Sequence, residues 1–149
     1  MPSAKNLIKR LQKVNKKSYL QKEVERIILT DTEIRDLKRD EFETGLYPDG
    51  TEIRPPYQSQ SYKAFKQSKN PKANGRVDLI DTGAFTNQLF QKSLGNSRFI
   101  FNSKDEKADM LKAKYSPKIF GLNKETFLEL QQTDYRDKLV RKLKQVTGL

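Results

Sequence analysis

The chain has 149 residues, of which 34% are hydrophobic and 33% are charged, and its formal net charge is +11. A globular chain usually has about 45–50% apolar and about 25% charged residues, so this composition excludes a large hydrophobic core and predicts one domain over 1–149. Cys and His are absent, which excludes disulfides, His-based catalysis and zinc sites built from these residues. No apolar run reaches the roughly 18–20 residues that cross a bilayer, so we expect no membrane partner.

The first predicted element is a helix that begins at Ser3, which has the side chain of an N-cap. A second helix is predicted over 18–43, because no Pro or Gly interrupts it and Gly45 follows as a helix-ending glycine. Thr30 and Glu33 have the spacing of a capping box, so a break near Thr30 and one continuous helix are both open. The apolar stripe of the first helix consists of Leu7, Ile8, Leu11 and Val14.

Residues 45–80 are predicted to form an irregular, extended arm or insertion loop. Pro48-Asp49-Gly50 is a turn signal, Pro55-Pro56 favours an extended path, and one helical turn is expected near 62–66. A loop of this length usually has a function. Its aromatic residues would be buried if the arm packed on a neighbouring subunit. They are Tyr47, Tyr57, Tyr62 and Phe65.

The positive charge is concentrated in two segments without acidic residues. Residues 1–22 carry seven bases and residues 54–76 carry six. Clustered Lys and Arg displace counterions from nucleic acid, although a solvated surface or a contact with an acidic protein explains them as well. The candidate contacts with DNA or a partner are Lys9, Arg10, Lys13, Lys63, Lys66, Lys69, Lys72 and Arg76.

Two strands, 84–94 and 97–103, are predicted to pair as an antiparallel hairpin around a turn at Gly95-Asn96. Two strands alone are marginally stable in water, so we expect further strands from the arm or from adjacent subunits. A short helix over 105–114 follows, and Asn123 is expected to cap the last helix. The predicted fold class is α+β, with long N-terminal helices, a small antiparallel sheet, a long extended arm and a C-terminal helix.

Two groups of acidic residues raise the alternative of a Mg²⁺-dependent nuclease, because converging carboxylates bind Mg²⁺ and basic segments hold nucleic acid. Turn and helix-start chemistry explain the same residues. The chain also has no Gly-rich phosphate loop and no metal-ligand motif. We therefore predict that it is not an enzyme and has no catalytic residue, metal or cofactor. The acidic groups are Asp78 with Asp81, and Asp105 with Glu106 and Asp109.

Three short phrases follow one another in order along the chain. The first, 42–50, ends in Pro48, Asp49 and Gly50; the second, 79–85, contains Asp81, Thr82 and Gly83; the third, 119–123, contains Phe120 and Gly121. The strand pair and a segment with Ala108 and Tyr115 lie between the second and the third. In this order, residues 18–147 resemble the Mu-like family of phage virion-morphogenesis and tail-completion proteins, which lie at the head–tail junction.

The resemblance implies a structural virion protein without catalytic residues, located in the neck or tail and assembled in the host cytoplasm. It implies an α+β subunit of a ring around the DNA channel. Its partners would be copies of itself and other head–tail connector, portal or tail-tube proteins, with non-specific DNA in the lumen. The runner-up interpretation, which depends on the basic segments alone, is a small basic nucleic-acid-binding protein.

Overall fold

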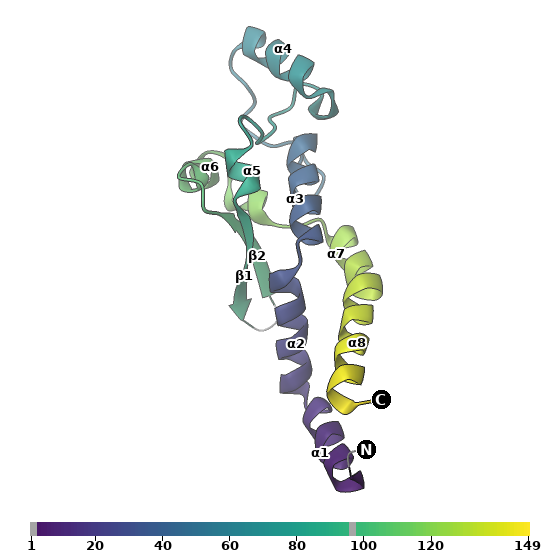
Figure 1. The fold of residues 1–149 in the computed structure, drawn as a ribbon. Coiled ribbons are helices and arrows are strands. Elements are labelled where there is room, and N and C mark those ends of the chain that lie inside the picture. Colours follow the sequence, from purple (N-terminus) through teal and green to yellow (C-terminus); the bar gives the residue numbers. More distant parts are fainter. Residues whose placement is uncertain (1–2, 96–97) are drawn as a thin grey trace.

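The computed structural model describes residues 3–95 and 98–149, and the protein is an elongated, mostly helical α+β structure (Figure 1). A body in the middle holds a β-hairpin, and helices extend from it in both directions. Among the described residues, no helix combines the length and the apolarity that crossing a bilayer requires.

One end of the molecule is a stem of three helices, α1 (Ala4–Val14), α2 (Lys17–Thr30) and α8 (Arg136–Thr147). The stem comprises residues 3–30 and 136–149. Helix α8 runs back along α2 and also contacts α1, so segments from both ends of the sequence lie side by side (Figure 1).

The break near Thr30 is confirmed, because α3 (Glu33–Thr44) begins as a separate helix. The predicted capping box is wrong. The Thr30 hydroxyl donates a hydrogen bond to the backbone oxygen of Arg26 at 2.8 Å. The Asp31 carboxylate accepts the backbone N–H of Glu33 instead, at 3.1 Å. As predicted, Gly45 ends α3, and its φ of +70° favours glycine.

The segment 45–80 differs most from its prediction. Its middle is not irregular but forms the ten-residue helix α4 (Gln60–Lys69), which Ser59 caps by accepting the backbone N–H of Tyr62 at 3.2 Å. Helix α4 projects from the body (Figure 1). The two limbs that carry it return to the chain's own core, so the expectation that the whole arm is extended is wrong. The buried residues of these limbs are Ile53, Ala73, Val77 and Leu79.

The hairpin consists of β1 (Leu89–Gly95) and β2 (Arg98–Ser103), which pair antiparallel from Leu89 opposite Ser103 to Gly95 opposite Arg98. The predicted strand over 84–94 is wrong at its start, where the short helix α5 (Ala84–Asn87) stands instead. The turn residue Asn96 lies outside the described residues. Within the described ranges the sheet has two strands, so the arm adds none to it.

The C-terminal part contains the two predicted helical regions, and it differs from the prediction in the start of the first helix, in a 3₁₀ helix and in a π-helical turn. Helix α6 (Ala108–Tyr115) begins later than expected, and the 3₁₀ helix η2 (Pro117–Phe120) follows it. Asn123 caps α7 (Lys124–Leu130) as predicted, because its Oδ1 accepts the N–H groups of the first helical turn at 2.9 and 3.1 Å. A π-helical turn, η3 (Gln131–Tyr135), joins α7 to α8.

The hydrophobic core lies where α2, α3 and the hairpin meet the short helices. Three rings stand at its centre, with Phe85 between Phe42 and Phe120 at centroid distances of 5.5 and 5.8 Å. These rings come from three separate segments of the sequence, so their contact depends on the complete fold.

Candidate functional site

The first and third phrases of the resemblance lie against each other. The turn Pro48-Asp49-Gly50 is closed by a hydrogen bond from the N–H of Gly50 to the backbone oxygen of Tyr47 at 2.9 Å. Gly121 approaches Pro48 so closely that a Cβ on Gly121 would lie 3.1 Å from Pro48 Cγ. The Asn123 side chain also donates to the backbone oxygen of Pro48 at 3.1 Å. These residues join two segments of the body.

The second phrase, Asp81-Thr82-Gly83, turns the chain into α5. Gly83 has a φ of +86°, and the Thr82 hydroxyl oxygen accepts the N–H of Ala84 at 3.3 Å. Helix α5 then places Phe85 against the ring of Phe120, the aromatic residue of the third phrase. The phrase residues therefore act as turns and packing contacts around one core.

Lys66, one of the bases predicted to contact DNA, has a different role in the structure. Lys66 is buried, with only 8% of the residue exposed, and its Nζ lies 2.5 Å from Oδ1 of the buried Asp78. Nζ also donates to the backbone oxygen of Ile80, and Asn70 Nδ2 donates to Asp78 Oδ2 at 2.9 Å. Because this ammonium is already paired, we interpret Lys66 as a structural residue and not as a contact with DNA or a partner.

The other predicted contacts of the arm are divided between paired and unpaired cations. Lys72 Nζ lies 2.7 Å from a carboxylate oxygen of Glu43, and Arg76 Nε donates to a backbone oxygen of α3 at 3.0 Å. Lys63 and Lys69 are exposed on α4, and neither has an ion pair within the described part of the chain. The arm thus offers fewer free cations than its sequence indicates.

The stem holds almost all of the net charge. It carries thirteen bases and three acids, a net charge of +10, whereas residues 31–135 carry seventeen bases and sixteen acids. The predicted contacts on α1 belong to this cluster, and the Arg10 guanidinium lies next to Gly148 at the end of α8. Folding therefore adds the bases of α8 to those of α1. The predicted contacts on α1 are Lys9, Arg10 and Lys13.

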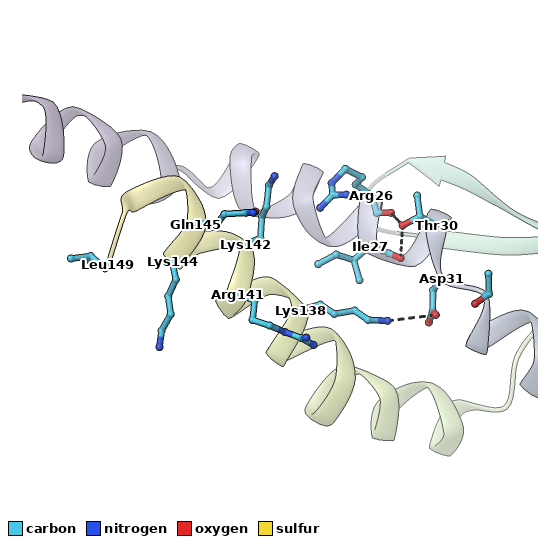
Figure 2. Close-up of a pocket in the computed structure, with 11 residues that line it drawn as sticks. Arg26, Ile27, Thr30, Asp31, Lys138, Arg141, Lys142, Lys144, Gln145 and Leu149 are labelled. Atoms are coloured by element: carbon cyan, nitrogen blue, oxygen red, sulfur yellow. Dashed lines mark hydrogen bonds and ion pairs between the residues drawn. The ribbon is translucent and has the colours of Figure 1, made fainter. Parts of the chain in front are cut away.

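A cleft of about 750 Å³ opens between the C-terminal half of α2 and the helix α8 (Figure 2). Asp31 is the one acidic residue among those that line it. Arg26 pairs with Glu23 at 3.1 Å. Lys138 Nζ lies 3.6 Å from Asp31 Oδ1, as Figure 2 shows. The remaining bases have no carboxylate within ion-pair distance in the residues that the structure describes. They are Arg141, Lys142 and Lys144.

Asp31 anchors α8 to α2 at one end of the cleft. The Tyr135 hydroxyl donates to Asp31 Oδ2 at 2.8 Å. Oxygens of Asp31, Glu33 and Asp134 lie within 4.8 Å of one another, which is the spacing of a candidate metal site. However, Lys138 Nζ lies 2.6 Å from Asp134 Oδ2 and 3.6 Å from Asp31 Oδ1, so an ammonium already pairs with two of the three carboxylates. We interpret it as a structural anchor.

This anchor predicts a loss of stability at alkaline pH. Burial, followed by the hydrogen bond to Asp31, raises the pKa of Tyr135 well above its ordinary value of about 10. The unfolded chain loses the phenol proton near pH 10, whereas the folded chain keeps it. The contribution of the protonated Tyr135 to the free energy of unfolding is therefore complete below pH 10 and falls above it by up to about 1.4 kcal/mol per pH unit. Urea unfolding between about pH 9 and 11 should show a shallower decline in Tyr135→Phe than in the wild type. Equal declines would contradict the assignment.

Asp78, Asp81 and Asp105, from the two acidic groups considered for a nuclease, line one pocket, but they do not form a cluster of three carboxylates with metal-ligand spacing among the described residues. Asp78 is committed to Lys66, and Asp109 pairs with Lys112 at 2.8 Å. Neither group brings three carboxylates within mutual reach among residues 3–95 and 98–149. The geometry thus gives no support to Mg²⁺-dependent cleavage.

An apolar groove of about 420 Å³ lies beside the hairpin, between β2 and the start of α7. Its floor contains buried core residues such as Ile34 and Phe101. Its upper walls carry apolar side chains that the chain covers only in part, so this face is an uncovered extension of the core. They are Leu94, Phe99, Ile100, Leu122 and Phe127.

Sequence reasoning identified the bases of α1 but missed those of α8 and Arg26, which complete the stem. The signal was present as four bases within 138–144, but Asp134 and Asp137 lie next to them, so this segment is not free of acids as 1–22 and 54–76 are.

Comparison of this chain with protein-family models, with curated proteins and with solved structures finds no match.

Proposed function

We propose that this chain is a structural subunit of a phage head–tail junction or tail, of which copies assemble as a ring around the DNA channel. The ordered phrases of the resemblance support this proposal, because their residues meet in one body around Phe85 and Phe120. The functional contacts would then be surfaces for other subunits.

The observation that carries the proposal is a pair of apolar surfaces that the single chain leaves uncovered. Helix α4 projects from the body and presents Tyr62 and Phe65, which are 45% and 52% exposed with their rings 6.2 Å apart. The apolar groove beside the hairpin is a separate surface. A projection and a groove at different places on one chain form a head-to-tail interface, and such interfaces close into rings when the rotation permits.

The test is the mass of the purified protein in solution. We expect light scattering to show a multimer for the wild type and a monomer for the double variant Tyr62→Ser/Phe65→Ser, because the variant removes both exposed rings of α4. Met110→Ser is the matched control, since Met110 is 56% exposed on α6 and lies outside both surfaces. Negative-stain images should show rings for the wild type and the control. A wild type that stays monomeric and is absent from virions would contradict the proposal.

A second candidate function is that of a small basic nucleic-acid-binding protein, and the net charge of +10 on the stem favours it. A monomer that binds duplex DNA at micromolar or lower concentration, with affinity falling steeply as salt rises, would support this candidate over the ring.

A further inference from the structure

We propose that the cleft between α2 and α8 binds the phosphodiester backbone of nucleic acid without reading its base sequence. The binding groups are Arg141, Lys142 and Lys144 of α8, which line the cleft and have no ion pair in the described ranges (Figure 2). This site adds a ligand to the structural subunit proposed above, and it does not require that the ring forms.

Most cations of the stem have no ion-pair partner in the described part of the chain. Of the thirteen bases on the stem, eleven have no carboxylate within ion-pair distance in the described ranges, and the exceptions are Arg26 and Lys138. Arg141 Nε donates only to the backbone oxygen of Asp137, at 3.4 Å. Like charges that folding brings together without partners repel one another, and an anion that binds among them relieves this repulsion.

The rest of the chain does not supply an equal negative charge. Residues 31–135 have a net charge of only +1, so a second copy of this chain adds no net negative charge to balance the +10 of the stem. The bases of α1 and α2 extend over residues 5–26, which is about 30 Å at 1.5 Å per helical residue. A ligand that pairs with bases distributed over this length must carry many negative charges. Nucleic acid does so, because duplex DNA carries one charge for about every 1.7 Å of its axis.

The types of base in the cleft limit the mode of binding. Two of its three unpaired bases are lysines, and a lysine ammonium acts as a compact point charge rather than as a bidentate reader of base edges. The cleft is an open groove between two helices, so a backbone can enter it from the side. We therefore expect contacts with phosphates that position the nucleic acid and little preference for sequence.

The experiment is a titration of the full chain against a fluorescent DNA duplex of about 20 base pairs, two helical turns, at several salt concentrations. The triple variant Arg141→Gln/Lys142→Gln/Lys144→Gln should bind at least about tenfold more weakly at 0.1 M salt, and its slope of log K against log[salt] should be smaller by about 2–3. The matched control Lys63→Gln/Lys69→Gln/Lys72→Gln removes the same charge from the arm. It should bind nearly as tightly as the wild type.

Two results with DNA overturn the site: no binding by the wild type, or a loss of affinity in the arm control as large as that in the stem variant. Two results with other ligands also overturn it. Tighter binding to polyglutamate than to DNA indicates an acidic protein, and tighter binding to vesicles of phosphatidylcholine and phosphatidylglycerol indicates a membrane surface. If single-stranded DNA or RNA also binds, and the stem variant loses the same affinity for it, the phosphodiester backbone is supported as the ligand. Comparison of these affinities identifies which kind of nucleic acid provides it. Light scattering on the same samples reports assembly separately. A stem variant that loses DNA but keeps its multimer leaves the ring proposal intact.

Discussion

Replacement of Asp78 by alanine should lower the free energy of unfolding by about 3–5 kcal/mol, since it leaves the buried ammonium of Lys66 without its carboxylate. The loss includes the hydrogen bond that Asn70 donates to Asp78. Urea unfolding followed by circular dichroism measures it. A loss well below this range would show that water reaches the pair.

The double variant Lys66→Met/Asp78→Leu distinguishes the destabilisation caused by an unpaired buried charge from that caused by lost packing. It removes both charges and keeps apolar volume, so we expect it to recover most of the stability that Asp78→Ala loses. Lys72→Met is the matched control, because it breaks an ion pair of the same limb that lies at the surface. We expect this control to leave the unfolding midpoint close to that of the wild type.

Replacement of Phe120 by alanine should cost about 3–5 kcal/mol, because this ring is fully buried and its removal leaves a cavity next to Phe85. Thermal unfolding should show a lower midpoint. Phe65→Ala is the control, since it deletes the same ring from an exposed position on α4. It should weaken assembly while the stability of the isolated subunit stays nearly unchanged. Equal thermal shifts in both variants would mean that the subunit depends on its neighbours for folding.

The sequence was sufficient for the elements whose signals are local. The cap at Ser3, the break near Thr30, the end at Gly45 and the cap at Asn123 each depend on a side chain or a glycine close in sequence to the backbone groups it serves. The pairing of the second half of the first strand with 98–103 followed from a short apolar run. These elements establish the α+β class.

Other elements depend on contacts that are distant in sequence. Helix α4 has no buried apolar stripe, and the buried residue that fixes it is a lysine, whose partner Asp78 lies twelve positions away. The π-helical turn shifts the helical register by one residue. As a result Leu128 and Tyr135, whose seven-residue spacing would place them on one face of an unbroken helix, differ in burial: Leu128 is exposed and Tyr135 is buried. Periodicity assumes an unbroken helix and cannot reveal such a shift.

The candidate site shows the same difference between local and distant information. The acid-free segment 54–76 predicted free cations on the arm, but Lys66 and Lys72 form ion pairs there. Four bases of α8 follow the acids Asp134 and Asp137 along the chain, but in the fold these four line the cleft (Figure 2). Net charge along the sequence is therefore a poor guide to net charge on a surface.

The concentration of charge at one end gives the molecule a strong electric dipole along its length. In a closed ring all copies point the same way, so their like-charged ends repel one another across distances within the screening length of about 10 Å at 0.1 M salt. Added salt should consequently strengthen self-association and weaken DNA binding, so that the two processes respond to ionic strength with opposite signs. A polyanion within the ring would act as the shared counterion that lets the basic ends come together.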